Sequence, residues 1–291
     1  MIDVKCVLDS GCALGEGPVW DVMEQALYFT NILGKTLNRF DPLTGEHISW
    51  AMPEHISCFG LRAKGGAIVA LRTGIHLFDF ESGSLEAIAD PEANDSRTRF
   101  SDGKVDRKGR FWAGTMPYEQ FDPICSLYRF DVDGTWEKIQ GELIIANGIG
   151  WSPDNQTMYH TDTLASKIFS YDFDIESGSV ANRRVLVDVP ESDGFPDGLT
   201  VDAEGFIWSA KFNGGQVIRY DPEGARERVL RMPVQRPTSC VFGGPNLNIL
   251  YVTTGGWEAS PQGKFSASAT DGGVFAAEVG VKGIPEPRFA G

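Results

Sequence analysis

The sequence lacks the features of a membrane protein or a nucleic-acid-binding protein. Its 291 residues contain no run of about 18 apolar residues, the length that a membrane-spanning helix needs. The first nine residues include an early acid and no long apolar stretch, so we expect no secretory signal. Basic residues are outnumbered, with 26 Lys and Arg against 40 Asp and Glu, and the formal charge of −14 disfavours binding to a phosphate backbone. We therefore expect neither a nucleic-acid nor a membrane partner.

Paired cysteines are also missing. The chain has five cysteines, an odd number, and none forms a Cys-x-x-Cys pair. Scattered cysteines of this kind are typical of reduced, buried thiols, so the sequence predicts a cytoplasmic protein without disulfides.

Several catalytic signatures are absent as well. The sequence has no Gly-x-Ser-x-Gly elbow, which argues against a serine hydrolase. Its four histidines show no zinc-binding helical spacing, and no Gly-x-Gly-x-x-Gly fingerprint opens a helix. These gaps leave oxygen-rich side chains as the main source of chemistry.

What the chain does contain is a series of short apolar runs bounded by turn residues. The runs are rich in aromatic and β-branched residues, are too short for helices, and show no 3.6-residue period. Examples are 26–29, 66–71, 111–114, 206–208 and 249–252. The sequence therefore predicts an all-β protein.

These runs recur in a fixed order. Each copy is a strand, a polar turn and a second strand, followed by an alternating strand that in five of the six copies ends in an aromatic residue and Asp. The turns start at Asp21, Ala63, Asp106, Ser152, Asp202 and Gly243, so successive copies lie 42, 43, 46, 50 and 41 residues apart. Such spacing is typical of propeller blades. We predict a six-bladed β-propeller with four-stranded antiparallel blades around a central channel, forming one domain over residues 1–291, with residues 2–15 and the C-terminal segment completing one blade together. The alternative is a β-sandwich whose turns coincide by chance.

The repeat also predicts a site. The residues five positions before each turn start should form a ring near one mouth of the channel: Glu16, Cys58, Ser101, Asn147, Asp197 and Thr238. Two carboxylates and an amide that converge there would repel one another unless a cation lies between them. All-oxygen ligation suits Ca²⁺, Mg²⁺ or Mn²⁺, and carboxylates also bind Zn²⁺ or Fe²⁺. The plainer interpretation is that each residue merely caps a turn.

A family resemblance runs almost from end to end and is carried by an ordered set of motifs. They include residues 14–20 (LGEGPVW), 99–106 (RFSDGKVD), 114–116 (GTM), 147–148 (NG), 196–198 (PDG), 213–215 (NGG), 240–244 (CVFGG) and 280–284 (GVKGI). In these motifs the chain resembles the senescence marker protein/gluconolactonase/regucalcin-like family of six-bladed propellers.

The resemblance implies a function and assigns roles. It implies one divalent metal ion held by Glu16, Asn147 and Asp197, with Asp197 also the general base. It implies substrate contacts at Arg99 and Glu119, and Ser101 stands where the family has Asn. The implied reaction is the opening of an aldonolactone to the free acid, with the metal as Lewis acid on the carbonyl.

Two other functions remain open. A phosphotriesterase or paraoxonase-like hydrolase uses a similar scaffold and similar oxygen ligands. A non-catalytic, calcium-binding regulator or scaffold is the second alternative, because propellers host many functions. For the lactonase we expect a small sugar lactone as partner and a monomer or a weakly associating homo-oligomer, while gluconic, galactonic, xylonic and arabinonic lactones all fit.

Overall fold

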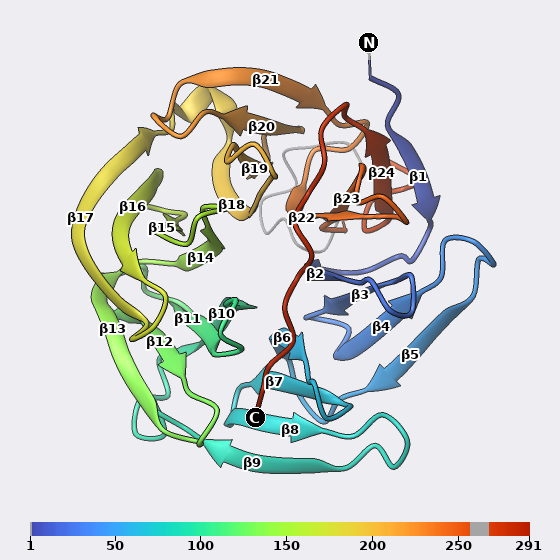
Figure 1. Cartoon of the computed structure of the whole chain (residues 1–291). Coiled ribbons are helices and arrows are strands. Elements are labelled where there is room, and N and C mark those ends of the chain that lie inside the picture. Colours follow the sequence, from blue (N-terminus) through green and yellow to red (C-terminus); the bar gives the residue numbers. More distant parts are fainter. Residues whose placement is uncertain (1, 257–267) are drawn as a thin grey trace.

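The chain forms six four-stranded antiparallel sheets arranged around a central channel (Figure 1). The structure is a computed structural model that describes residues 2–256 and 268–291. Within these residues the only helical segment is one 3-10 turn, η1 (Glu191–Asp193). The predicted six-bladed β-propeller is confirmed.

The first three blades follow one another along the chain. Blade 1 consists of β2 (Gly15–Asp21), β3 (Ala26–Asn31), β4 (Thr36–Phe40) and β5 (His47–Ala51). Blade 2 consists of β6 (Ile56–Leu61), β7 (Ala67–Leu71), β8 (Gly74–Phe78) and β9 (Leu85–Ala89). Blade 3 consists of β10 (Thr98–Val105), β11 (Phe111–Pro117), β12 (Cys125–Phe130) and β13 (Trp136–Leu143).

The other three blades repeat this order, and the last one closes the ring. Blade 4 consists of β14 (Ala146–Trp151), β15 (Thr157–Asp162), β16 (Lys167–Asp174) and β17 (Ser179–Asp188). Blade 5 consists of β18 (Phe195–Val201), β19 (Ile207–Phe212), β20 (Gln216–Tyr220) and β21 (Arg226–Arg231). Blade 6 consists of β22 (Pro237–Gly243), β23 (Ile249–Thr254), β24 (Val274–Glu278) and β1 (Lys5–Leu8).

Ring closure joins the two ends of the chain, as the sequence predicted. Strand β1 is the outermost strand of blade 6 and pairs with β24, with Cys6 opposite Phe275. Because the N-terminal strand completes a sheet built from the C-terminal part, backbone hydrogen bonds within blade 6 hold the two ends of the chain together.

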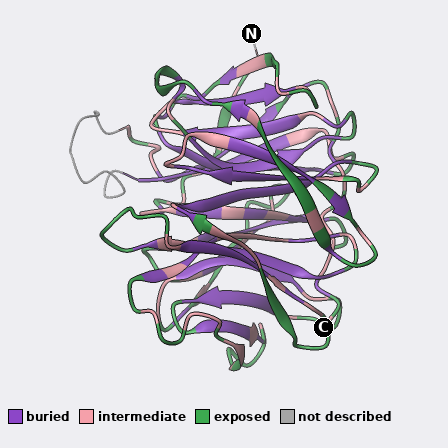
Figure 2. Ribbon diagram, turned by 90° about the vertical axis from the view of Figure 1, so that its left-hand side faces the viewer, coloured by how far each residue is buried: buried purple, intermediate pink, exposed green. Residues whose placement is uncertain are grey.

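Burial decreases from the channel outward, which explains the short apolar runs in the sequence. The inner strand β6 and its neighbour β7 are buried along their whole length, whereas the outer strand β5 is mostly exposed. Figure 2 shows buried strands through the interior of the molecule and exposed segments at its surface. Inner strands are covered on both faces by adjacent blades, so they carry continuous apolar residues rather than an alternating pattern.

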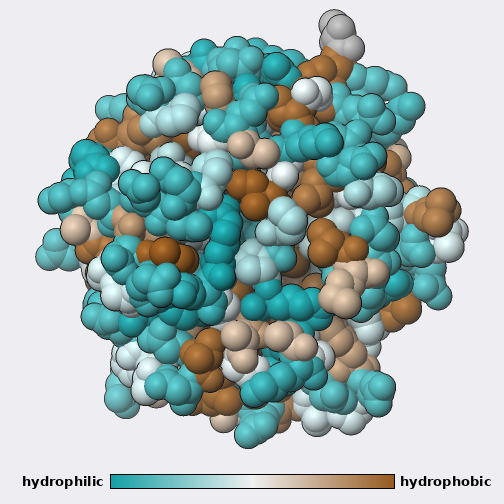
Figure 3. Space-filling model, in the orientation of Figure 1, coloured by the Kyte–Doolittle hydropathy of each residue, from teal (hydrophilic) through white to brown (hydrophobic). Residues whose placement is uncertain are grey.

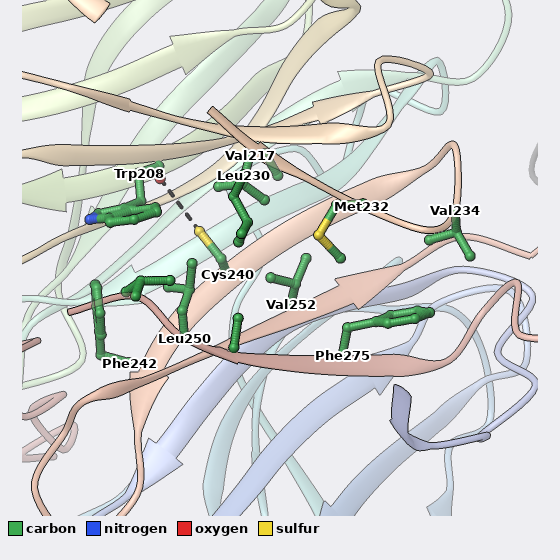
Figure 4. Packing of buried hydrophobic residues seen from close by; sticks show 13 residues of the cluster. Trp208, Val217, Leu230, Met232, Val234, Cys240, Phe242, Leu250, Val252 and Phe275 are labelled. Carbon is green, nitrogen blue, oxygen red and sulfur yellow. Dashed lines mark hydrogen bonds between the residues drawn. The ribbon is translucent and has the colours of Figure 1, made fainter. Parts of the chain in front are cut away.

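The core lies between neighbouring blades. Between blades 5 and 6, Trp208 packs edge-on to Phe242 with ring centroids 5.9 Å apart, and the thiol of Cys240 donates to the backbone oxygen of Trp208 at 3.4 Å (Figure 4). All five cysteines are free, as predicted. In the described part of the chain, no helix has the length and apolarity needed to span a membrane.

The C-terminal segment crosses one mouth of the channel (Figure 1). It reaches the turns between the first and second strands of several blades, where Ala203 N donates to Lys282 O at 2.8 Å and Ala290 N donates to Gly109 O at 3.0 Å. Glu286 forms an ion pair with Lys104 at 3.1 Å. On this face, apolar side chains form only small separate patches among hydrophilic ones (Figure 3). The predicted ring lies toward the opposite mouth, where the inner strands begin.

Candidate active site

Every inner strand is irregular at the predicted ring position. The antiparallel register shifts between Glu16 and Val19, Ile56 and Cys58, Phe100 and Gly103, Asn147 and Ile149, Pro196 and Leu199, and Pro237 and Ser239. A β-bulge bends its strand and re-aims a side chain. The six-fold recurrence of this irregularity marks one level of the channel as different from the regular sheet around it.

Glycines let the ring residues of adjacent blades approach closely. A Cβ on Gly148 would lie 2.5 Å from the backbone oxygen of Asp197, and one on Gly198 would lie 2.1 Å from the hydroxyl of Ser239. Gly17 has a φ of +52°, a conformation that L-residues rarely adopt. The glycine after each of the three candidate ligands is therefore required by the fold.

The three predicted metal ligands are buried at this level. Glu16, Asn147 and Asp197 are 7, 8 and 6% exposed. Asn147 Nδ2 donates to Asp197 Oδ1, and the Asn147 Oδ1 accepts from Gly148 N at 3.2 Å. The carboxylate of Glu16 accepts from Gly17 N at 2.8 Å. The structure thus places Asn147 and Asp197 in direct contact, with Glu16 near enough for its charge to interact with that of Asp197.

A third carboxylate adds to the negative charge of the channel. Burial raises the pKa of Glu16 well above its usual value, and the charges of Asp197 and Asp102 raise it further. Burial and then Asp102 likewise raise the pKa of Asp197. Burial raises the pKa of Asp102 to about 6. Within the described residues, none of the three forms an ion pair with Lys or Arg. Cations beyond ion-pair distance, Arg99 for Glu16, Lys104 for Asp102 and Lys211 for Asp197, offset only part of the effect of burial on the pKa values.

These residues fit a divalent cation. Among the described residues, no three His, Cys, Asp or Glu side chains group as ligands of one ion, but the predicted set contains two carboxylates and an amide. Oxygen donors of this type are those that hard divalent ions prefer. Ligation through the oxygen of Asn147 would need its amide group to turn over, because its nitrogen faces Asp197.

Arg99 lies between the ring and the main cavity. Both of its side-chain hydrogen bonds leave from Nη1, to Phe100 O at 2.8 Å and Ser57 Oγ at 3.3 Å. Burial lowers the pKa of Arg99, and the charges of Tyr118 and Glu16 oppose that effect. Tyr118 lines the cavity and Glu16 lies in the ring, so the Arg99 guanidinium interacts with one residue of the cavity and one residue of the ring.

The main cavity is lined by residues outside the ring. It has a volume of about 660 Å³ and lies among loops of blades 1 to 3, at residues 35, 54–55, 72, 96–97, 118–120, 122 and 124. Glu119 is exposed and lines this cavity, as expected of a substrate contact. Ser101 is buried in the bulge of β10 and does not line it. The converging carboxylates, rather than the cavity volume, make the ring the candidate site for chemistry.

Sequence reasoning missed two features of this region. Asp102 accepts a hydrogen bond from Gly103 N at 2.7 Å, and its charge also acts on both Glu16 and Asp197. Its position beside Ser101 in the ring motif was the available signal. The basic residues of the cavity come from loops that the repeat does not align, so no spacing pointed to them.

Comparison with known proteins places the chain in a family. The family model for the SMP-30/Gluconolactonase/LRE-like region matches residues 14–256. The chain is 39% identical over 289 residues to the 6-deoxy-6-sulfogluconolactonase of Pseudomonas putida, covering 99% of each chain, and 36% identical over 297 residues to rabbit (Oryctolagus cuniculus) regucalcin, covering 100% of this chain and 99% of the relative. The crystal structure of a calcium-binding protein, regucalcin, from Agrobacterium tumefaciens matches with a TM-score of 0.93 at 28% identity, covering 99% of this chain and 97% of that chain. The chain therefore belongs to the SMP-30/gluconolactonase/LRE-like family.

Proposed function

We propose that this protein is a divalent-metal-dependent lactonase that opens a sugar-acid lactone to the free acid. The observation that carries the proposal is the convergence of Glu16, Asn147 and Asp197 in one channel, without a basic ion-pair partner and beside a cavity. Membership of a family that includes gluconolactonases supports the same reaction.

Asp197 is suited to act as the general base. Its carboxylate is buried, and its pKa is raised from the usual value, which brings it toward the range in which a carboxylate accepts a proton efficiently at neutral pH. It takes a proton from the attacking water, a C–O bond forms at the lactone carbonyl, and the ring C–O bond then breaks. The same proton passes to the departing ring oxygen, so the products are the hydroxyl and the acid.

Glu16, Asn147 and Asp197 would hold the metal ion. When bound, a divalent ion supplies Lewis-acid polarisation of the carbonyl and stabilises the negative charge that develops on its oxygen. The relative from Agrobacterium tumefaciens is a calcium-binding protein, so Ca²⁺ stands beside Zn²⁺, Mn²⁺, Mg²⁺ and Fe²⁺ among the ions to test.

Arg99, Ser101 and Glu119 would orient the sugar ring. Arg99 keeps Nε and Nη2 free to donate to substrate, since its two hydrogen bonds use Nη1. The hydroxyl of Ser101 makes no side-chain hydrogen bond within the described part of the chain, and Glu119 offers an exposed acceptor. Fixing the ring by several hydrogen bonds lowers the entropic cost of reaching the transition state.

Lactone hydrolysis by metal-stripped protein tests the proposal. Single divalent ions are added back one at a time. The substrates are aldonolactones and 6-deoxy-6-sulfogluconolactone, the lactone that appears in the name of the Pseudomonas putida relative. We expect turnover above the spontaneous rate only with metal, and we expect Asp197→Ala to lower kcat by about 10²-fold or more.

Asp188→Ala is the matched control, because Asp188 is an exposed acid on the outer strand β17. It should keep wild-type turnover. Absence of metal-restored turnover on every lactone would refute the proposal, and phosphotriesters would then be tested next.

A further inference from the structure

We propose that Lys35, His55 and Arg99 form a subsite for an anionic substituent of the lactone, at the end of the substrate away from its carbonyl. This inference rests on the proposed function, because the cavity and the ring would serve one substrate. It adds a substrate class, an aldonolactone that carries a sulfonate, phosphate or carboxylate, and two residues with no role so far, Lys35 and His55.

The cavity receives basic side chains from several blades. Lys35 lies in the turn between β3 and β4, His55 lies just before β6, and Arg72 and Arg97 lie in loops of blade 2 and before blade 3. The positive charge of Arg97 is already balanced by Asp95, with which it forms a bidentate contact at 2.6 and 2.8 Å. Among the described residues, the other basic side chains of the cavity are not balanced by such a contact.

Two cations, Lys35 and Arg99, act on His55. Burial lowers the pKa of His55, and the charges of Arg99 and Lys35 lower it further. In the described part of the chain, neither Lys35 nor Arg99 has a carboxylate within 4 Å. Like charges brought together in this way favour a bound anion between them.

The one acid near His55 is engaged elsewhere. The charge of Glu54 raises the pKa of His55 and so opposes the effect of the two cations. The Oε1 atom of Glu54, however, accepts hydrogen bonds from the backbone N of Thr73 at 2.8 Å and from the Thr73 hydroxyl at 2.6 Å. These hydrogen bonds hold the carboxylate toward the turn between β7 and β8. At His55, two cations therefore act against one carboxylate that is already hydrogen-bonded. The other acids that line the cavity, Glu119 and Asp122, are exposed.

The backbone at Lys35 provides a second, independent observation. Lys35 has a φ of +54°, and its carbonyl accepts from Met52 N at 2.8 Å. The same turn position in blades 4 and 5 holds Ser166 (φ +54°) and Gly215 (φ +59°), whose carbonyls accept from Val189 N at 2.8 Å and Met232 N at 2.9 Å. Glycine adopts this conformation without strain, whereas a long side chain does not. Blade 1 thus keeps a cation where the turn favours glycine, which is expected if its charge has a function.

The arrangement also gives the substrate a direction. Arg99 interacts with Glu16 in the ring and with His55 at the cavity. A lactone whose carbonyl faces the ring would pass Arg99 and extend its other end toward His55 and Lys35. Sulfonate, phosphate and carboxylate groups all accept charge-assisted hydrogen bonds from such donors.

Two measurements on the full chain test the subsite. The first compares kcat/KM on glucono-1,5-lactone with its 6-sulfo, 6-phospho and 6-carboxy counterparts, in the presence of metal. The second measures, by calorimetry and without metal, the binding of 6-deoxy-6-sulfoglucose and glucose 6-phosphate against glucose. We expect a preference for at least one anion in both, and the ranking of the three anions identifies the substituent.

Lys35→Gly tests the role of the lysine without endangering the fold, because it relieves the strained turn. Loss of one charge-assisted contact should raise KM for the preferred anionic lactone, and weaken binding of the anionic sugar, by about tenfold. Ser166→Gly is the matched control: it makes the same backbone change in blade 4, removes no charge, and should leave both measurements unchanged.

The results separate the two proposals. Equal kcat/KM for neutral and anionic lactones, or an unchanged anion affinity in Lys35→Gly, would overturn the subsite and leave the lactonase standing. If no lactone is hydrolysed, the proposed lactonase function is refuted. The subsite proposal then stands only if the anionic sugars still bind more tightly than glucose and Lys35→Gly removes that difference in affinity.

Discussion

Buried carboxylates occur in two regions of this propeller, and their partners differ. One group lies in the turns between the first and second strands of blades, with Asp106 in blade 3 and Asp202 in blade 5. The other group lies in the ring, with Glu16, Asp102 and Asp197. Asp106, Asp202, Glu16 and Asp197 are almost inaccessible to solvent, and Asp102 is partly buried. Burial alone therefore does not distinguish the two groups.

The turn carboxylates are fully paired. Asp202 Oδ2 accepts from Trp208 Nε1 at 2.9 Å and from Arg219 Nε at 2.9 Å, and its Oδ1 accepts from the backbone N atoms of Glu204 and Phe206 at 3.0 Å each. Asp106 repeats this pattern with Trp112 and Arg110. Each carboxylate ties a turn to a buried tryptophan and a guanidinium, which is a structural role.

The ring carboxylates have few partners and repel one another. Each accepts a local backbone or amide hydrogen bond, and the pKa values of Glu16 and Asp197 are raised. The comparison teaches that a buried acid is structural where cations and N–H groups contact it directly, and available for chemistry where no cation lies within ion-pair distance.

The largest effect on stability is expected from Asp202→Asn. Removing one partner of a buried ion pair leaves Arg219 partly unpaired and should lower the free energy of unfolding by about 3–5 kcal/mol. Denaturant unfolding measures this change, and lactonase activity per folded molecule should remain at the wild-type level. Glu204→Gln is the control: Glu204 contacts the same guanidinium at 2.6 Å but is 58% exposed, so it should cost less than about 1 kcal/mol. Equal costs for the two variants would contradict the distinction drawn between buried and exposed partners.

The sequence predicted the fold well because the fold is repetitive. Six copies of one strand and turn pattern gave the blades, their closure by the two ends of the chain, and the ring level at Glu16, Asn147 and Asp197. Those predictions depend on periodic features that each blade must satisfy in order to pack against its neighbours.

Features without a repeat could not be predicted in this way. The cavity is built from loops of different blades, and Lys35 and His55 are close only after folding. The register shifts in all six inner strands also lay beyond the sequence pattern, since apolar runs do not reveal where a ladder changes register. The roles of Glu16, Asn147 and Asp197 as metal ligands stay predictions. The same holds for the roles of Arg99, Ser101 and Glu119 in substrate binding.

The second prediction concerns pH and metal. A carboxylate with a raised pKa in the folded state binds protons more tightly there than in the unfolded chain, so the metal-free protein should lose stability as pH rises from the ordinary carboxylate range through the raised pKa values of Glu16 and Asp197. Each unit of pKa elevation costs about 1.4 kcal/mol above the raised value, and a chain of this size shifts its Tm by about 2 °C per kcal/mol. Thermal unfolding between pH 5 and pH 8, with and without a divalent ion, measures the effect.

A bound cation should reverse this trend, because it favours the ionised carboxylates. We therefore expect the metal-dependent rise in Tm to be larger at pH 8 than at pH 5. A metal-free Tm that rises with pH over this range, or a metal effect independent of pH, would show that the ring carboxylates do not carry the repulsion inferred for them.

The smallest effect is expected from Asp197→Asn in the metal-free protein, and its sign is opposite to that of Asp202→Asn. The substitution removes one of three repelling charges and keeps an oxygen that can accept the hydrogen bond from Asn147 Nδ2. The free energy of unfolding at pH 8 should rise by about 1 kcal/mol, the equivalent of one pKa unit, and its dependence on pH should weaken. Denaturant unfolding of the two variants side by side provides the comparison. If Asp197→Asn destabilised the protein as Asp202→Asn does, Asp197 would belong with the structural carboxylates and the case for a cation in the ring would fall with it.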